Sequence, residues 1–265
     1  MLFEVLQALI YGIVQGITEF LPISSTAHLI LLPNILGWED MGMTFDIALH
    51  LGTAVSVLLF FWKDWIKLTK AGMTRPKSSD GKLFWFIMLA TIPAGIIGFL
   101  FEDFFEQAQK NMLLIGFMLI VLGILLYLAD TRCKSTKKIN HVNFLSAILI
   151  GLSQAVAMIP GVSRSGITIT TGRFSGLTRE SAARFAFLLS TPTIVGLGIY
   201  KIKDIIGENF HLLPFLIAVI TSGLVGALVI RYLLDFLKTR SFGIFAVYRI
   251  VLGMIVLAGV LMNKL

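Results

Sequence analysis

Six apolar runs, each long enough to cross a membrane as a helix, dominate this sequence of 265 residues. About 20 helical residues cross the roughly 30 Å hydrocarbon core of a bilayer. The runs lie near 45–62, 83–101, 112–129, 181–199, 212–230 and 244–263. With 57% hydrophobic and 14% charged residues, the chain carries more apolar surface than a water-soluble domain can bury. We therefore expect a single all-α integral membrane domain over 1–265, with six transmembrane helices.

Two further apolar stretches, near 3–32 and 142–172, are interrupted in the middle by proline, glycine and hydroxyl side chains. The interruptions read LPISSTAH at 21–28 and IPGVSRSG at 159–166. Backbone that leaves a helix inside the membrane must find partners in protein or water, so such a break is tolerated only beside a polar cavity. Each stretch is therefore predicted to form a re-entrant helical hairpin that enters and leaves by the same face.

The two broken stretches resemble each other. An alignment of YGIVQGITEFLPISS at 11–25 with IGLSQAVAMIPGVS at 150–163 pairs Gly12 with Gly151, Gln15 with Gln154 and, after one gap, Pro22 with Pro160. We expect two internal repeats, about 1–130 and about 140–265, each a broken hairpin followed by three spans. Because three is odd, the second repeat is inverted relative to the first, as in transporter folds whose broken helices meet near the midplane. Chance similarity between apolar segments is the alternative.

Basic residues concentrate in four loops. The segments 63–82, 130–143, 173–184 and 231–240 hold six, four, three and three Lys or Arg, which is 16 of the 22 in the chain. With re-entrant hairpins these loops share one face, and the positive-inside tendency places that face in the cytoplasm. The opposite face carries the acidic turn EDFFE at 102–106. The net charge of +7 thus follows from topology, and no nucleic-acid partner is expected.

A new helix is predicted to begin after each break. Ser24 or Ser25 in the first hairpin, and Ser163 or Ser165 in the second, are the candidate N-cap residues. Both helices would then present free backbone N–H groups, and the positive end of the helix dipole, toward the centre of the membrane. This arrangement favours an anion, and phosphate suits it.

Polar side chains in the hairpins extend this argument. Gln15 and Glu19 are four residues apart, so on a helix they share a face and could jointly hold a hard cation through oxygen. His28 follows the first break, and Arg164, in the second, has the side chain best shaped for bidentate phosphate contact. Helix packing for Gln15, and a structural ion pair for Glu19 with Arg164, are the alternatives.

Three polar residues outside the hairpins receive ordinary explanations. His50 is expected to be a packing histidine rather than a ligand. Asp46 and Arg249 fall near span ends, where snorkelling or local pairing accounts for them.

QGITEFLPISSTAH at 15–28 and PGVSRSGIT at 160–168 resemble two segments of the undecaprenyl pyrophosphate phosphatases of the bacitracin-resistance type. Those segments are (E/Q)xxxE with a following SS-T-x-H, and PGxSRSxxT. The resemblance covers essentially the whole chain. It implies hydrolysis of undecaprenyl pyrophosphate to undecaprenyl phosphate and inorganic phosphate, which recycles the lipid carrier of peptidoglycan synthesis and lowers sensitivity to bacitracin.

The resemblance also implies a divalent cation, a multi-pass protein of the bacterial inner membrane, and a site open toward the outer face. Mg²⁺ or Ca²⁺ would be held by Glu19 and Gln15, where Gln15 replaces the glutamate that is common at this position. The implied substrate is a polyprenyl pyrophosphate dissolved in membrane lipid, and a homodimer is left open.

Chemistry and resemblance together define a candidate site. The candidate catalytic residues are Glu19, Ser25, His28 and Arg164. The candidate substrate-binding residues are Ser24, Thr26, Ser163, Ser165 and Thr168. Ser25 is the first candidate nucleophile, with Glu19 or His28 as its base, while attack by His28 itself or by an activated water stays open.

A secondary transporter or flippase for an anionic lipid or phosphate substrate is the rival interpretation, because it would use the same inverted repeat and the same anion site. The combination of Glu19, Ser25 and His28 favours the hydrolase. A carrier needs anion donors but has less need of an acid–base pair beside a hydroxyl.

The predicted orientation can be tested by thiol labelling in whole cells. Because basic residues concentrate on one face, Glu106→Cys in a Cys133→Ser background should react with an impermeant reagent, and Lys77→Cys in the same background should not. The reverse labelling pattern would overturn the orientation.

Overall fold

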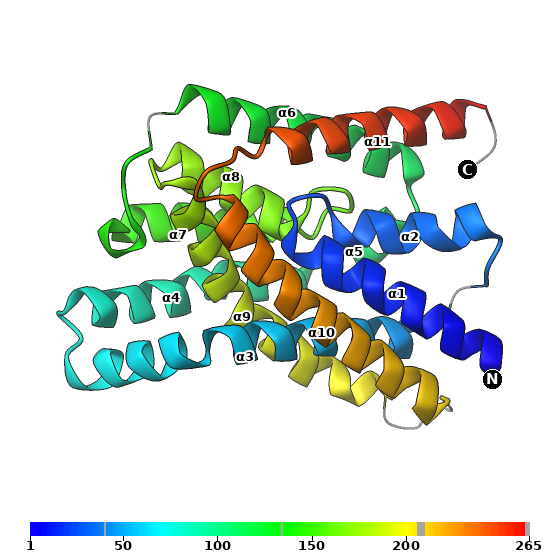
Figure 1. The fold of residues 1–265 in the computed structure, drawn as a ribbon, viewed down its shortest axis with the longest axis horizontal. Helices are drawn as coiled ribbons and strands as arrows, with labels where there is room; N and C mark the ends of the chain where they lie inside the picture. The colour runs from blue at the N-terminus through cyan, green and yellow to red at the C-terminus, as the bar shows by residue number, and fades with distance from the viewer. Residues whose placement is uncertain (40, 134, 206–209, 263–265) are drawn as a thin grey trace.

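The computed structural model describes residues 1–39, 41–133, 135–205 and 210–262 (Figure 1). These residues form eleven α-helices and one short 3₁₀ helix, and no strand longer than an isolated bridge. The elements are α1 (Leu2–Phe20), α2 (Ser25–Leu36), α3 (Met43–Thr74), α4 (Ser79–Leu100), α5 (Glu102–Gln109), α6 (Met112–Arg132), η1 (Ile139–His141), α7 (Phe144–Val156), α8 (Arg164–Phe174), α9 (Arg179–Ile205), α10 (Leu212–Phe236) and α11 (Gly243–Leu261). The predicted all-α class is confirmed.

Six helices in the described part of the chain are long and apolar enough to cross a membrane. They are α3, α4, α6, α10, α11 and the Arg179–Lys201 part of α9. Each overlaps one of the six predicted runs, so the predicted number of spans is confirmed; residue 263, the expected end of the last run, lies outside the described residues. The protein is a multi-pass membrane protein.

The two interrupted stretches fold as pairs of short helices. In Figure 1, α1 and α2 lie side by side in blue, α7 and α8 lie side by side in green, and the turns between the helices of each pair face one another near the centre of the molecule. Residues 21–24 separate the first pair and residues 157–163 the second. The broken hairpins therefore exist as predicted, and their re-entry into a membrane stays a prediction.

Each break ends at a serine with unusual backbone geometry. Ser24 (φ 76°) and Ser163 (φ 71°) are the two non-glycine residues with positive φ in the described part of the chain. Each is the N-cap of the helix that follows, and its hydroxyl accepts from Ala27 N at 3.4 Å or Gly166 N at 3.1 Å. This left-handed conformation is strained for a side chain with a Cβ, and such strain is concentrated at functional sites.

Glycine residues in α1 and α7 allow the two hairpins to pack closely against membrane-spanning helices. A Cβ added at Gly12 of α1 would meet the carbonyl oxygen of Ala218 in α10 at 3.3 Å. A Cβ added at Gly151 of α7 would meet the Cα of Ala90 in α4 at 2.7 Å. Small residues permit this close backbone approach between membrane helices. Each hairpin thus packs on a span from the other half of the chain, as two inverted repeats would, although the repeat itself stays a prediction.

Candidate active site

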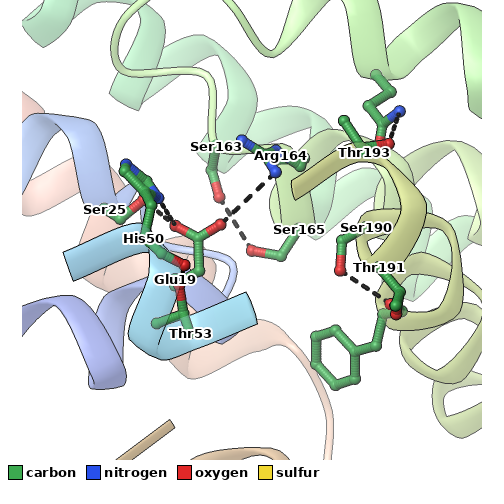
Figure 2. A network of polar contacts seen from close by, with 12 residues as sticks. Glu19, Ser25, His50, Thr53, Ser163, Arg164, Ser165, Ser190, Thr191 and Thr193 are labelled. Carbon is green, nitrogen blue, oxygen red and sulfur yellow. Dashed lines mark hydrogen bonds and ion pairs between the residues drawn. The ribbon is translucent and has the colours of Figure 1, made fainter. Parts of the chain in front are cut away.

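Glu19 lies at the centre of a buried polar cluster formed where the two hairpins meet (Figure 2). It occupies the last turn of α1, and the residue is only 7% exposed. Its Oε2 accepts a hydrogen bond of 2.7 Å from the hydroxyl of Ser25, the first residue of α2. The chain reverses direction between these two residues, and this reversal brings the carboxylate and the hydroxyl together.

Gln15 and His50 complete the same side of the cluster. The Gln15 amide nitrogen donates to Glu19 Oε2 at 3.2 Å and lies 3.1 Å from Nδ1 of His50, which comes from α3. Because an amide N–H can only donate, His50 Nδ1 accepts, and neutral His50 carries its proton on Nε2. His50, expected to pack with its ring satisfied rather than to bind a ligand, finds a partner in Gln15, and its ring belongs to the cluster, 3.9 Å from Glu19.

His28 takes a position away from the Ser25 hydroxyl. Its Nδ1 donates to the carbonyl oxygen of Ser24 at 2.7 Å, and its Nε2 lies 2.7 Å from the hydroxyl of Tyr248 in α11. The two rings are stacked, with centroids 5.7 Å apart and an angle of 6°. Both ring nitrogens of His28 thus have partners, and of the two candidate bases it is Glu19 that contacts Ser25.

The second hairpin supplies an arginine to the opposite side of the carboxylate. Nη1 of Arg164, the first residue of α8, lies 4.0 Å from Glu19 Oε1. This nitrogen is buried and has no hydrogen-bond partner in the part of the chain that the structure describes. The loose contact leaves a guanidinium donor free for an anionic group placed beside Glu19.

Ser163 and Ser165 join the hairpins to each other. The Ser165 hydroxyl lies 3.2 Å from that of Ser163 and donates to the carbonyl oxygen of Leu21 at 3.0 Å. Leu21 begins the break of the first hairpin, so this bond holds the two breaks together across 144 positions of sequence.

Two predicted substrate-binding residues stand apart from the cluster. The Thr168 hydroxyl donates to the carbonyl oxygen of Arg164 at 2.7 Å, one turn earlier in α8. Such a bond to the helix's own backbone is common for threonine within a helix. Thr26 lies half-buried in the first turn of α2, and no hydrogen bond links its side chain to the cluster within the described residues.

Arg249 is the largest departure from the sequence-based expectation. Its side chain, expected near a span end, is completely buried. Nη1 donates to the carbonyl oxygen of Pro22 at 3.2 Å, and Nη2 donates to those of Gly161 at 2.8 Å and Val162 at 2.9 Å. The explanation by snorkelling or local pairing is therefore wrong. The available signal was an arginine within a span that has no acidic residue, a costly placement that indicates a specific partner.

The cluster has the parts needed for acid–base chemistry on an anion. A serine hydroxyl bonded to a carboxylate is the arrangement of a nucleophile with its base. The buried Nη1 of Arg164, a partly exposed side chain, lies beside the starts of two helices, and both features favour negative charge. Together, fold and site define a multi-pass membrane protein with a buried cluster of a carboxylate, a hydroxyl and an arginine where two broken hairpins meet.

Comparison with known proteins gives the family. The chain belongs to the family described as bacitracin resistance protein BacA, whose model matches residues 8–255. It is 50% identical over 253 residues to the undecaprenyl-diphosphatase of Pelotomaculum thermopropionicum, with 96% of each chain covered. It is 46% identical over 254 residues to the undecaprenyl-diphosphatase of Moorella thermoacetica, with 96% of this chain and 97% of that protein covered.

The role assigned to Arg249 leads to a prediction about stability. In Arg249→Lys, a single ammonium group would have to donate to the carbonyl groups of both breaks. Each buried carbonyl left without a donor lowers the free energy of unfolding by about 1–3 kcal/mol. We expect a clearly lower melting temperature in detergent for this variant. Arg231→Lys, at an exposed arginine of α10, is the matched control and should melt like the wild type. Equal melting temperatures for the two variants would contradict the role of Arg249.

Proposed function

We propose that this protein hydrolyses undecaprenyl pyrophosphate to undecaprenyl phosphate and inorganic phosphate, and so recycles the lipid carrier of bacterial cell-wall synthesis. The observation that carries the proposal is the 2.7 Å hydrogen bond from Ser25 to Glu19. This contact supports Ser25 as the nucleophile and Glu19 as its base, and the relatives that match this chain over nearly its full length are named undecaprenyl-diphosphatase. Loss of the pyrophosphate form of the carrier also accounts for the family's name, which refers to bacitracin resistance.

In the proposed first step, Ser25 Oγ attacks the terminal phosphorus and Glu19 accepts the hydroxyl proton. The Oγ–P bond forms as the bridging P–O bond breaks, and undecaprenyl phosphate leaves as the anion. Water then attacks the phosphoserine, Ser25 Oγ leaves and recovers its proton from Glu19, and inorganic phosphate is released. Each step keeps the proton within the 2.7 Å contact between these two residues.

Arg164 and the two helix starts stabilise the charge on the transferred phosphoryl group. The free Nη1 of Arg164 is a donor for a phosphoryl oxygen beside Ser25. Phosphoryl transfer depends mainly on positioning and on stabilising charge in the transition state, and arginine donors make a large contribution there. His28, held by Ser24 and Tyr248, is assigned to substrate positioning.

The residues of the cluster fit a hard divalent cation, Mg²⁺ or Ca²⁺. Gln15 Oε1 is buried without a hydrogen-bond partner in the described structure, while the amide nitrogen of the same side chain is bonded to Glu19. Mg²⁺ needs only one or two protein oxygen ligands when substrate phosphates and water complete its coordination. Glu19 and Gln15 Oε1 would hold the ion, which supplies charge neutralisation to the pyrophosphate.

We further propose that the protein lies in the bacterial inner membrane with its site open toward the outer face. The support is the concentration of 16 of 22 basic residues in the four loops that share one face. The substrate reaches the site from the surrounding membrane lipid. A homodimer stays a prediction.

Purified protein in detergent separates the enzyme from a carrier, because no transmembrane gradient exists there. Wild type should release phosphate from undecaprenyl pyrophosphate, and Ser25→Ala and Glu19→Gln should each lower the rate roughly 100-fold or more. Ser153→Ala, at a half-buried serine bonded to its own helix at Ile150, is the matched control and should keep full activity. Release at the wild-type rate from Ser25→Ala would reject attack by Ser25, and no release from wild type, with lipid flux in liposomes, would favour the carrier.

Arg164 provides a separate test of charge against geometry. Arg164→Lys keeps the charge but loses the planar fork, so we expect turnover to fall by an amount equivalent to about 1.5–3 kcal/mol, and Arg164→Ala to lose more. Steady-state phosphate release and melting temperature should be measured together. If Arg164 only pairs with Glu19 for folding, the double variant Arg164→Ala with Glu19→Gln will recover both stability and activity, and such recovery would refute its catalytic role.

A further inference from the structure

A polar cavity lies away from the Glu19 cluster, at the end of the molecule where α3 ends and α4 begins; these helix ends are at the left in Figure 1. Its volume is about 900 Å³, and residues from α3, α4, α6, α8, α9 and the segments following α6 and α10 line it. No residue of the Glu19 cluster is among them. We call it the basic-end cavity.

Basic side chains outnumber acidic ones in the lining of this cavity. The basic residues are Lys67, Lys138, Arg173, Arg179, Arg184 and Lys238. The acidic residues are Asp64, Asp80, Asp130 and Glu180. The cavity therefore has a net positive charge before any ligand enters.

Arg179 and Arg184 of α9 are each held by an ion pair that engages only one nitrogen of the guanidinium group. Arg179 Nε donates to Asp130 at 2.7 Å, and Arg184 Nη2 donates to Asp64 at 2.6 Å while its guanidinium lies over the ring of Phe61. No other hydrogen bond of either guanidinium is found among the described residues, and their side chains are 34% and 35% exposed. Each planar fork is thus fixed in position with N–H groups still available to a ligand.

Asp130 is not available to repel an anion. Its carboxylate is buried and forms ion pairs with Arg179 and Arg173. It also accepts a hydrogen bond of 2.9 Å from the backbone N–H of Phe242. Arg173, itself buried, has an Nε without a hydrogen-bond partner in the described structure. Lys138 is exposed, and no ion pair is found for it within the described residues.

From this geometry we propose that the basic-end cavity is a second anion site, which takes the phosphate group of an anionic phospholipid. Arginine forks match phosphate oxygens bidentately, and the volume is in the range of ordinary ligand pockets. A cavity at the ends of membrane-spanning helices is level with lipid headgroups, and basic pockets between such helices bind anionic ones. The site does not depend on the proposed phosphatase function, because none of its residues belongs to the Glu19 cluster.

Native mass spectrometry of the protein in detergent, with phosphatidylglycerol or phosphatidylcholine added, tests the assignment. Wild type should retain phosphatidylglycerol in preference to phosphatidylcholine. Lys138→Gln with Arg184→Gln should bind phosphatidylglycerol about tenfold less, because two charged donors are lost. The matched control, Lys70→Gln with Arg240→Gln, removes two exposed charges from the same end but outside the cavity, and should bind as wild type does.

A second variant guards against misfolding. Asp64→Asn with Arg184→Gln removes the whole ion pair and keeps the net charge, so it should also lose phosphatidylglycerol while releasing phosphate from undecaprenyl pyrophosphate at the wild-type rate. Equal loss of lipid in the cavity variants and in the control would overturn the proposal in favour of general surface charge. If millimolar inorganic phosphate raises the melting temperature of wild type, but not of Lys138→Gln with Arg184→Gln, and phosphatidylglycerol raises neither, the lipid source is rejected.

Discussion

The rest of the structure depends on how one buried guanidinium, that of Arg249, satisfies the backbone at two breaks inside the membrane domain. Carbonyl groups that leave a helix at membrane depth have no water to bond, so the protein must supply their donors. Arg249 supplies them to Pro22 in the first hairpin and to Gly161 and Val162 in the second. Within the described residues no carboxylate pairs with it, so carbonyl dipoles alone offset the burial of its charge. Removing either break would leave part of the buried guanidinium without its acceptors, which couples the two hairpins energetically.

The fixed approach of the two breaks determines the geometry of the active site. With the break of the first hairpin tied to Ser165 through Leu21, Glu19 and Ser25 on one side face Arg164 on the other. Arg164 Nη1 lies 4.0 Å from Glu19 Oε1, which is too long for a hydrogen bond, so the two side chains do not form a tight ion pair. A tight pair would have to be broken before an anion could bind. Under the proposed function, the loose contact would leave Arg164 available to a phosphoryl oxygen and Glu19 available to the Ser25 proton.

The sequence predicts those parts of the molecule that depend on local patterns. Hydropathy is sufficient for the six spans, and proline, glycine and serine within apolar stretches are sufficient for the two breaks, so Glu19, Ser25 and Arg164 could be placed near one another. Arg249 and His50 could not, because their contacts with the hairpins join residues 227 and 35 positions apart and follow from the packing of whole helices. Thr168 could be picked out from its motif, but the bond from its hydroxyl to the Arg164 carbonyl oxygen follows from the helix itself, and its role in binding substrate stays a prediction.

The charge balance of the site bears on what else must enter it with the substrate. Glu19 and Arg164 offset each other, so the pair by itself provides little net attraction for a pyrophosphate that carries several negative charges. Arg249 adds positive charge, but its donors are directed to carbonyl groups and not toward the cluster. The positive ends of α2 and α8 contribute only partial charges. Under the proposed function a further positive charge beside Glu19 would offset the pyrophosphate, and the proposed divalent cation would find an oxygen ligand in Gln15 Oε1, which has no hydrogen-bond partner among the described residues. Compared with a second carboxylate, a neutral amide at this position would bind the proposed ion more weakly but would leave more of its positive charge for the substrate.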